Sequence, residues 1–215
     1  MNQGTFDGGA VLFLNRDKSL LFRPKFHALS WKSNEGLMIA WDDAVYAWVV
    51  THRVSMLDGL MRVLSVVGRG GTVWILSGLL LIALRRFSWW SWLRLLIVLL
   101  ITSFVVDHVL KPAVGRERPF VNKPMVRLIG DRPGDASFPS GHAANSFAAA
   151  WTLTREATSA SAFPYWLLAV GIAYSRVYLG VHYPLDVVGG GLVGLLCARV
   201  VLSFRWRRPN SSKEH

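Results

Sequence analysis

Long apolar runs separated by short polar and basic segments occupy the chain from about residue 70 onward. A helix needs about 20 mainly apolar residues to cross a bilayer, and a further stretch, residues 141–157, is alanine-rich and only weakly hydrophobic. The strongly apolar runs are TVWILSGLLLIAL (72–84), WLRLLIVLLITSFVVDHVL (92–110), FPYWLLAVGIAYSRVYLGV (163–181) and LDVVGGGLVGLLCARVVLSF (185–204). The pattern predicts an all-α transmembrane bundle of five or six spans.

Residues 41–67 follow a different pattern. Apolar residues recur there at helical spacing, but charged side chains interrupt them. This is typical of an amphipathic helix that lies in the membrane interface, although an ordinary amphipathic helix fits it as well. We therefore expect an N-terminal segment (1–69) with an interfacial helix, a helix-bundle domain (70–204) and a basic C-terminal tail (205–215).

Gly190 and Gly194 give the last apolar run a small-xxx-small spacing, which allows two helices to approach closely. The single cysteine, Cys197, lies in the same run, so an intramolecular disulfide and a cysteine zinc cluster are excluded. We expect Cys197 to be a buried apolar residue.

Composition agrees with a membrane protein. Charged residues make up 17% of the chain, against about 25% in soluble domains. The net charge of +11 indicates anionic lipid or an anionic substrate rather than nucleic acid as the partner. The basic segments 85–94 and 205–210 would share the cytoplasmic side. Loop 111–140 and turn 179–184 would then face away from the cytoplasm.

Three short motifs lie at those outer ends, and the first is KPAVGRERP (111–119). Lys111 ends a predicted span, and Arg116 and Arg118 follow it. A lysine point charge and an arginine fork together suit a phosphate group. A snorkelling lysine beside solvated arginines is the alternative. We assign Arg116 no direct role.

The second motif is FPSGHAANSF (138–147), at the start of the alanine-rich helix. Ser140 is a natural N-cap, and Gly141 lets a ligand approach the backbone. Free N–H groups at a helix start bind anions, and His142 would lie beside the bound group. A helix cap without a ligand is the alternative.

The third motif is SRVYLGVHYPLD (175–186). Arg176 adds a third cation, and His182 lies in the turn before a new helix. Asp186, four residues on, is placed to accept the Nδ1–H of His182 and leave Nε2 free, as an aspartate does in a catalytic triad. A histidine that caps a tight turn is the alternative.

Together the three motifs resemble the signature motifs of the type 2 phosphatidic acid phosphatase superfamily, over about residues 70–204. The resemblance implies a membrane lipid phosphatase that needs no metal and no cofactor. Members of the lipid phosphatase branch typically have six spans, whereas five are predicted here.

The resemblance also implies a role for each motif residue. Lys111, Arg118 and Arg176, with the backbone at Ser140 and Gly141, would hold the phosphoryl oxygens. His182 would attack phosphorus and form a phosphohistidine, oriented by Asp186. His142 would protonate the leaving oxygen and then activate water.

Other acidic and histidine residues form no obvious metal site. Asp42 and Asp43 are adjacent, so in a helix they diverge by about 100 degrees. Asp107 and His108 lie near Lys111, as supporting residues or as simple interface residues.

The substrate would be an isoprenyl pyrophosphate or a glycerolipid phosphate, with lipid A phosphate as an alternative. A vanadium haloperoxidase and a non-catalytic protein that binds anionic lipid are further alternatives. The oligomeric state is open.

Overall fold

The computed structural model describes residues 35–157 and 162–204, and within these ranges every regular element is a helix. The all-α prediction is therefore confirmed for this part of the chain. The α-helices are α1 (Glu35–Thr51), α2 (Ser55–Val67), α3 (Thr72–Ala83), α4 (Trp89–Phe104), α5 (Lys111–Val114), α6 (Pro119–Asn122), α7 (Gly141–Glu156), α8 (Phe163–Tyr178) and α9 (Pro184–Ser203).

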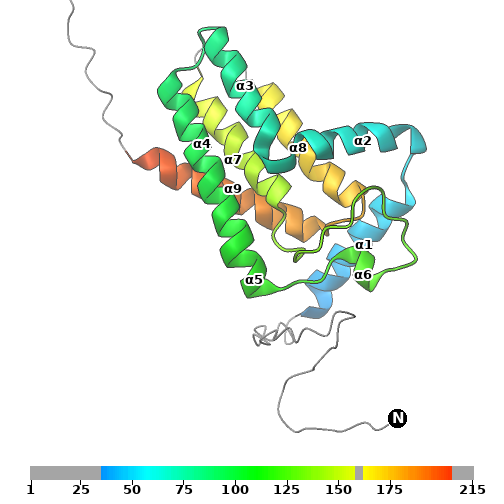
Figure 1. Ribbon diagram of the computed structural model, residues 1–215. Coiled ribbons are helices and arrows are strands. Elements are labelled where there is room, and N and C mark those ends of the chain that lie inside the picture. The colour runs from blue at the N-terminus through cyan, green and yellow to red at the C-terminus, as the bar shows by residue number, and fades with distance from the viewer. Residues whose placement is uncertain (1–34, 158–161, 205–215) are drawn as a thin grey trace, which may run out of the picture.

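Helix α7 is the central helix of the bundle and packs against α4, α8 and α9 (Figure 1). Its alanines are fully buried, including Ala144, Ala148 and Ala149. This position explains why the stretch is only weakly hydrophobic, because it needs small side chains for close contact with other helices.

Two glycines of α9 allow its contact with α7. A Cβ at Gly190 would meet the carbonyl oxygen of Ser140, and a Cβ at Gly194 would meet that of Ala144. The close approach predicted from the small-xxx-small spacing is thus confirmed. Cys197, in contrast, is only half-buried, because it lines an apolar groove between α4 and α9.

The outer faces of the bundle are apolar. Leu80 of α3, Leu100 of α4 and Leu192 of α9 each expose 60% or more of their surface. Among the described residues, the helical stretches Trp89–Asn122 and Pro184–Ser203 are long and apolar enough to cross a membrane. The pair α2 and α3, bent by 55°, makes a third candidate if it is one span. Five spans remain a prediction.

The stretch from 92 to 110 is not one regular α-helix. It continues past α4 as a π-helical turn, Val105–Leu110, and then as α5, which begins at Lys111. The first motif therefore starts on the same continuous helical stretch and leaves it at Gly115, whose φ of 62° favours glycine.

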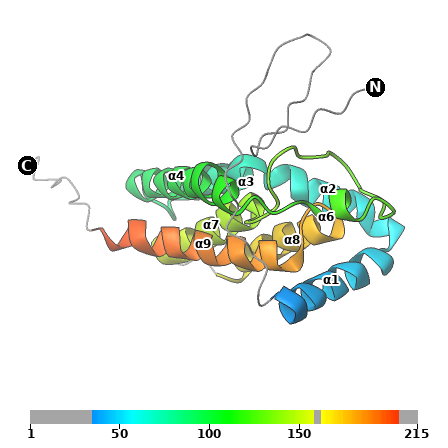
Figure 2. The same cartoon turned by 90° about the horizontal axis from the view of Figure 1, so that it is seen from below.

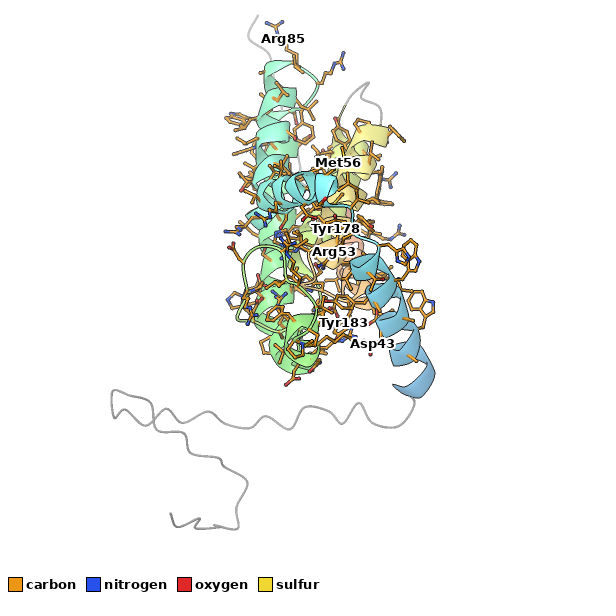
Figure 3. All side chains as sticks on the ribbon, turned by 90° about the vertical axis from the view of Figure 1, so that its right-hand side faces the viewer. Asp43, Arg53, Met56, Arg85, Tyr178 and Tyr183 are labelled. Atoms are coloured by element: carbon orange, nitrogen blue, oxygen red, sulfur yellow. The ribbon has the colours of Figure 1, made fainter. Side chains whose placement is uncertain are left out.

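The single helix expected over 41–67 is wrong, because the chain forms α1 and α2 with a break at 52–54. Tertiary contacts hold this break. The Tyr178 hydroxyl donates to the Val54 carbonyl (2.7 Å), and the Arg53 guanidinium lies 5.7 Å from the Tyr178 ring centroid (Figure 3). Helix α1 then lies at the edge of the bundle against α8 and α9 (Figure 2).

Candidate active site

The three motifs meet at one cavity of about 1400 Å³. Its wall comes from α2, the π-helical turn, α5 and the loop after it, the loop before α7, the start of α7, and the end of α8 with the turn after it. The predicted site residues that line it are Lys111, Arg118, Gly141, His142, Arg176 and His182. The other two, Ser140 and Asp186, are fully buried. The structure thus brings all three motifs together, although they span 76 positions from Lys111 to Asp186.

His182 lies between Asp186 and Arg118. Its Nδ1 is 3.5 Å from Asp186 Oδ2, and its Nε2 is 3.3 Å from Arg118 Nη1. The expected orientation is therefore present, with Nδ1 toward the carboxylate, but the Nδ1 contact is long. Burial lowers the pKa of His182 to about 4, although Asp186 opposes this shift. A neutral imidazole at neutral pH is the form that a nucleophile requires.

Three shorter hydrogen bonds hold Asp186. The carboxylate accepts from Ser137 Oγ (2.5 Å), from the backbone N–H of Tyr183 (2.8 Å) and from Arg116 Nη1 (2.6 Å). The sequence motifs do not predict the role of Ser137, and they predict no direct role for Arg116. Only the spacing of Arg116 within the first motif could have drawn attention to it.

Lys111 and Arg118 share one acidic partner, Asp135, from the loop before α7. Lys111 also donates to Asp107 (2.6 Å), and Arg118 Nη2 donates to Asp135 (2.8 Å). Burial alone would raise the pKa of Asp135, but the two cations lower it to about 2. Of the two alternatives for Asp107, a supporting residue or a simple interface residue, the contact with Lys111 favours the supporting residue. His108 instead stacks on Phe104.

The start of α7 differs from the predicted cap. Ser140 occupies the N-cap position, but its side chain makes no capping hydrogen bond. Its backbone N–H donates to the carbonyl of Asp186 (2.9 Å), and its buried hydroxyl has no partner among the described residues. Capping by the Ser140 side chain is therefore wrong. Buried hydroxyls normally have a partner, so this one is an exception among the described residues.

Helix α2 forms a wall of the site that the sequence analysis did not foresee. The Ser65 carbonyl accepts a hydrogen bond from His142 Nε2 (3.1 Å), and the Ser65 hydroxyl accepts one from Arg176. Because a carbonyl only accepts, His142 carries its proton on Nε2 in this arrangement. One residue thus contacts two of the predicted site residues.

The described residues contain no group of three or more His, Cys, Asp or Glu that could hold a metal ion. Asp42 and Asp43 point to different partners, as their adjacency predicts. Asp42 is fully buried against Arg116, whereas Asp43 pairs with Lys123 (3.1 Å).

An apolar helix bundle with two histidines and three cations around one cavity defines a phosphate-processing membrane protein. The sequence model of the PAP2 superfamily matches residues 91–210, and the chain belongs to this superfamily. This confirms the resemblance inferred from the three motifs, and the chain is a PAP2-type phosphatase.

The relatives include enzymes that act on several lipids. The chain is 37% identical to an undecaprenyl-diphosphatase of Sulfolobus acidocaldarius, over 66% of this chain and 68% of that protein. It is 34% identical to a lipid A 4'-phosphatase of Bacteroides thetaiotaomicron, over 58% of this chain and 61% of that protein.

Among solved structures, the PAP2-type phosphatidylglycerolphosphate phosphatase of Bacillus subtilis is similar, with a TM-score of 0.64 and 26% identity. The match covers 80% of this chain and 87% of that one. The likeness therefore includes part of the chain before residue 91, which the family model does not match.

Proposed function

We propose that this protein is an integral membrane phosphatase that hydrolyses a lipid phosphate or diphosphate through a phosphohistidine on His182. The observation that carries the proposal is one cavity lined by two imidazoles and three cations, with His182 Nδ1 facing Asp186. The phosphatase relatives support it.

The first step forms the phosphoenzyme. Lys111, Arg118 and Arg176 bind the phosphoryl oxygens and stabilise the charge that builds up on them in the transition state. His182 Nε2 attacks phosphorus as the bond from phosphorus to the leaving oxygen breaks. His142, with a second proton on Nδ1 while its Nε2–H stays bonded to the Ser65 carbonyl, donates the Nδ1 proton to that oxygen.

The second step releases phosphate. His142 takes a proton from water, the oxygen of the water attacks phosphorus, and the bond between phosphorus and His182 Nε2 breaks. Inorganic phosphate leaves, and both histidines return to their starting forms. Gly141 begins α7, where free backbone N–H groups favour an anion. The backbone N–H of Ser140 is not one of them, because it donates to the Asp186 carbonyl (2.9 Å).

The membrane arrangement belongs to the same proposal. Five spans would place the cavity on the extracytoplasmic side, opposite the basic segment 85–94, with the N-terminal segment 1–69 at the interface before the bundle 70–204. The exposed leucines of α3, α4 and α9 support contact with lipid. The tail 205–215 lies outside the described residues.

An amphiphilic substrate fits this placement, because its tails stay in lipid while its headgroup reaches the cations. Arg62 and Arg132 also line the cavity, beyond the three cations of the motifs, and so does Arg69, which is paired with Asp131 (2.8 Å). A diphosphate carries more negative charge than a monophosphate, so these arginines favour an isoprenyl diphosphate. A glycerolipid phosphate is the second candidate, and lipid A phosphate is the alternative that one relative supports.

A phosphate-release assay in detergent tests the function. Undecaprenyl diphosphate, phosphatidylglycerol phosphate, phosphatidic acid and lipid A are each supplied to the wild-type protein and to His182→Ala. We expect release from at least one lipid and loss of turnover in the variant. Residual activity above about a thousandth of wild type would rule out His182 as the nucleophile. Lipid binding without phosphate release would instead support the non-catalytic alternative.

A further inference from the structure

A buried carboxylate on α1 contacts the catalytic region from outside the segment that the family model matches. Asp42 has no exposed surface. Its Oδ1 accepts a hydrogen bond from the backbone N–H of Leu185 (2.8 Å), and its Oδ2 accepts one from Arg116 Nη2 (2.5 Å). Leu185 is in the first turn of α9, next to Asp186, so Asp42 ties α1 to the part of α9 that orients His182.

Arg116 connects the two carboxylates. One of its nitrogens donates to Asp42, and the other donates to Asp186 at 2.6 Å. Its guanidinium also lies 4.2 Å from the Tyr183 ring centroid. Figure 3 shows Tyr183 and Asp43, the residue after Asp42 in the sequence, where α1 meets the bundle. The planar fork of arginine suits such a bridge, because it presents several donors in a fixed geometry.

The charges of this group explain why two carboxylates are present. Attack by His182 Nε2 on phosphorus leaves a positive charge on the ring, and Asp186 is the carboxylate placed to stabilise it. With Arg116 alone beside it, Asp186 would be neutralised as an ion pair. Asp42 supplies a second negative charge, so Asp42, Arg116 and Asp186 together carry a net charge of −1. At short range in a buried site, the change in net charge from 0 to −1 strongly increases the attraction for a positively charged imidazole.

We infer that Asp42 is a positioning residue for the nucleophile. The Asp42 carboxylate balances the charge of Arg116 and so leaves Asp186 able to stabilise phosphorylated His182. This inference rests on the proposed phosphohistidine mechanism. It extends the active site to α1, and it assigns Arg116 the role of linking α1 to the catalytic dyad.

Variants that change the charge of the side chain but nearly keep its shape separate this role from simple anchoring of α1. Asp42→Asn keeps an oxygen that can accept from Leu185 N–H but removes the charge. We expect kcat to fall by roughly 10- to 100-fold, the range found for residues that orient metal-binding histidines, while KM stays unchanged. Asp43→Asn is the matched control, because Asp43 is the next residue, is partly exposed and pairs with Lys123. It should stay within about twofold of wild type, as expected for a surface ion pair.

The double variant Asp42→Asn with Arg116→Gln gives the decisive comparison. It removes one negative and one positive charge, so the group returns to a net charge of −1 on Asp186. We expect its kcat to exceed that of Asp42→Asn alone by about fivefold or more, which corresponds to about 1 kcal/mol in activation free energy. If Asp42 only anchors α1, the double variant will be no better than Asp42→Asn, and that result overturns the inference. An Asp42→Asn variant with normal kcat overturns it as well.

Two measurements keep the test valid if a variant is poorly folded. Thermal unfolding in detergent identifies loss of structure, and Asp42→Glu, which keeps the charge, should retain clearly more kcat than Asp42→Asn. Equal loss in both overturns the inference. His182→Ala and wild type are assayed in parallel. A wild type that releases no phosphate from any lipid refutes the proposed function, whereas an active wild type without the rescue refutes only the role of Asp42.

Discussion

The contact between α7 and α9 makes a sharp prediction about Gly194. In Gly194→Ala, the new Cβ would overlap the carbonyl oxygen of Ala144 and lie 2.8 Å from its carbonyl carbon and 3.0 Å from its Cα. These are backbone atoms of the central helix, so no side chain can rotate away. The two helices must therefore separate, and contacts along their shared face are lost.

The size of the effect follows from two opposing contributions. Overpacking of a well-packed core typically costs about 1–3 kcal/mol, and a backbone obstacle places this site at the upper end. Alanine regains at most about 1 kcal/mol of helix propensity over glycine. The net loss of unfolding free energy is then about 2 kcal/mol, or roughly 4–8 °C in melting temperature for a chain of this size.

Gly59→Ala provides the control, because Gly59 is also in a helix and nothing lies within 4 Å of its added Cβ. We expect this variant to be as stable as wild type or slightly more stable. Thermal unfolding of the three proteins in the same detergent measures the difference. Equal melting temperatures for Gly194→Ala and Gly59→Ala would refute the packing argument.

Three other predictions concern the site. Activity should persist in excess EDTA, because the charge on the phosphate is met by Lys111, Arg118, Arg176 and the start of α7; loss with EDTA and recovery with Mg²⁺ would contradict this. Because burial lowers the pKa of His182 from 6.5 to about 4, the unfolded chain binds this proton first. Stability should therefore be complete above pH 6.5 and fall toward pH 4, and a His182→Gln variant should show a shallower decline in its melting temperature. Asp135→Asn should remove the acidic partner of Arg118 and one of the two acidic partners of Lys111. Inorganic phosphate should therefore inhibit about two- to fivefold more tightly, as measured by its inhibition constant; an unchanged constant would show that Asp135 does not compete with phosphate.

The apolar runs predicted most helices well, because burial in lipid or protein imposes a pattern on each run separately. The motif residues could be found because each motif is short, and its chemistry depends on neighbours within a few positions. His182 and Asp186, four residues apart, are an example.

The sequence by itself therefore determined the long helices after residue 70 and the residue types that we propose to bind a phosphate, but not the short helices α5 and α6. The tertiary structure alone decided which distant residues support them. Ser65 contacts Arg176 from 111 positions away, and Asp42 contacts Arg116 from 74 positions away. A single serine on a helix face, or one of two adjacent aspartates, has no local pattern that reveals its partner. The break between α1 and α2 has the same cause, since contacts with Tyr178 hold it rather than a local helix-breaking residue.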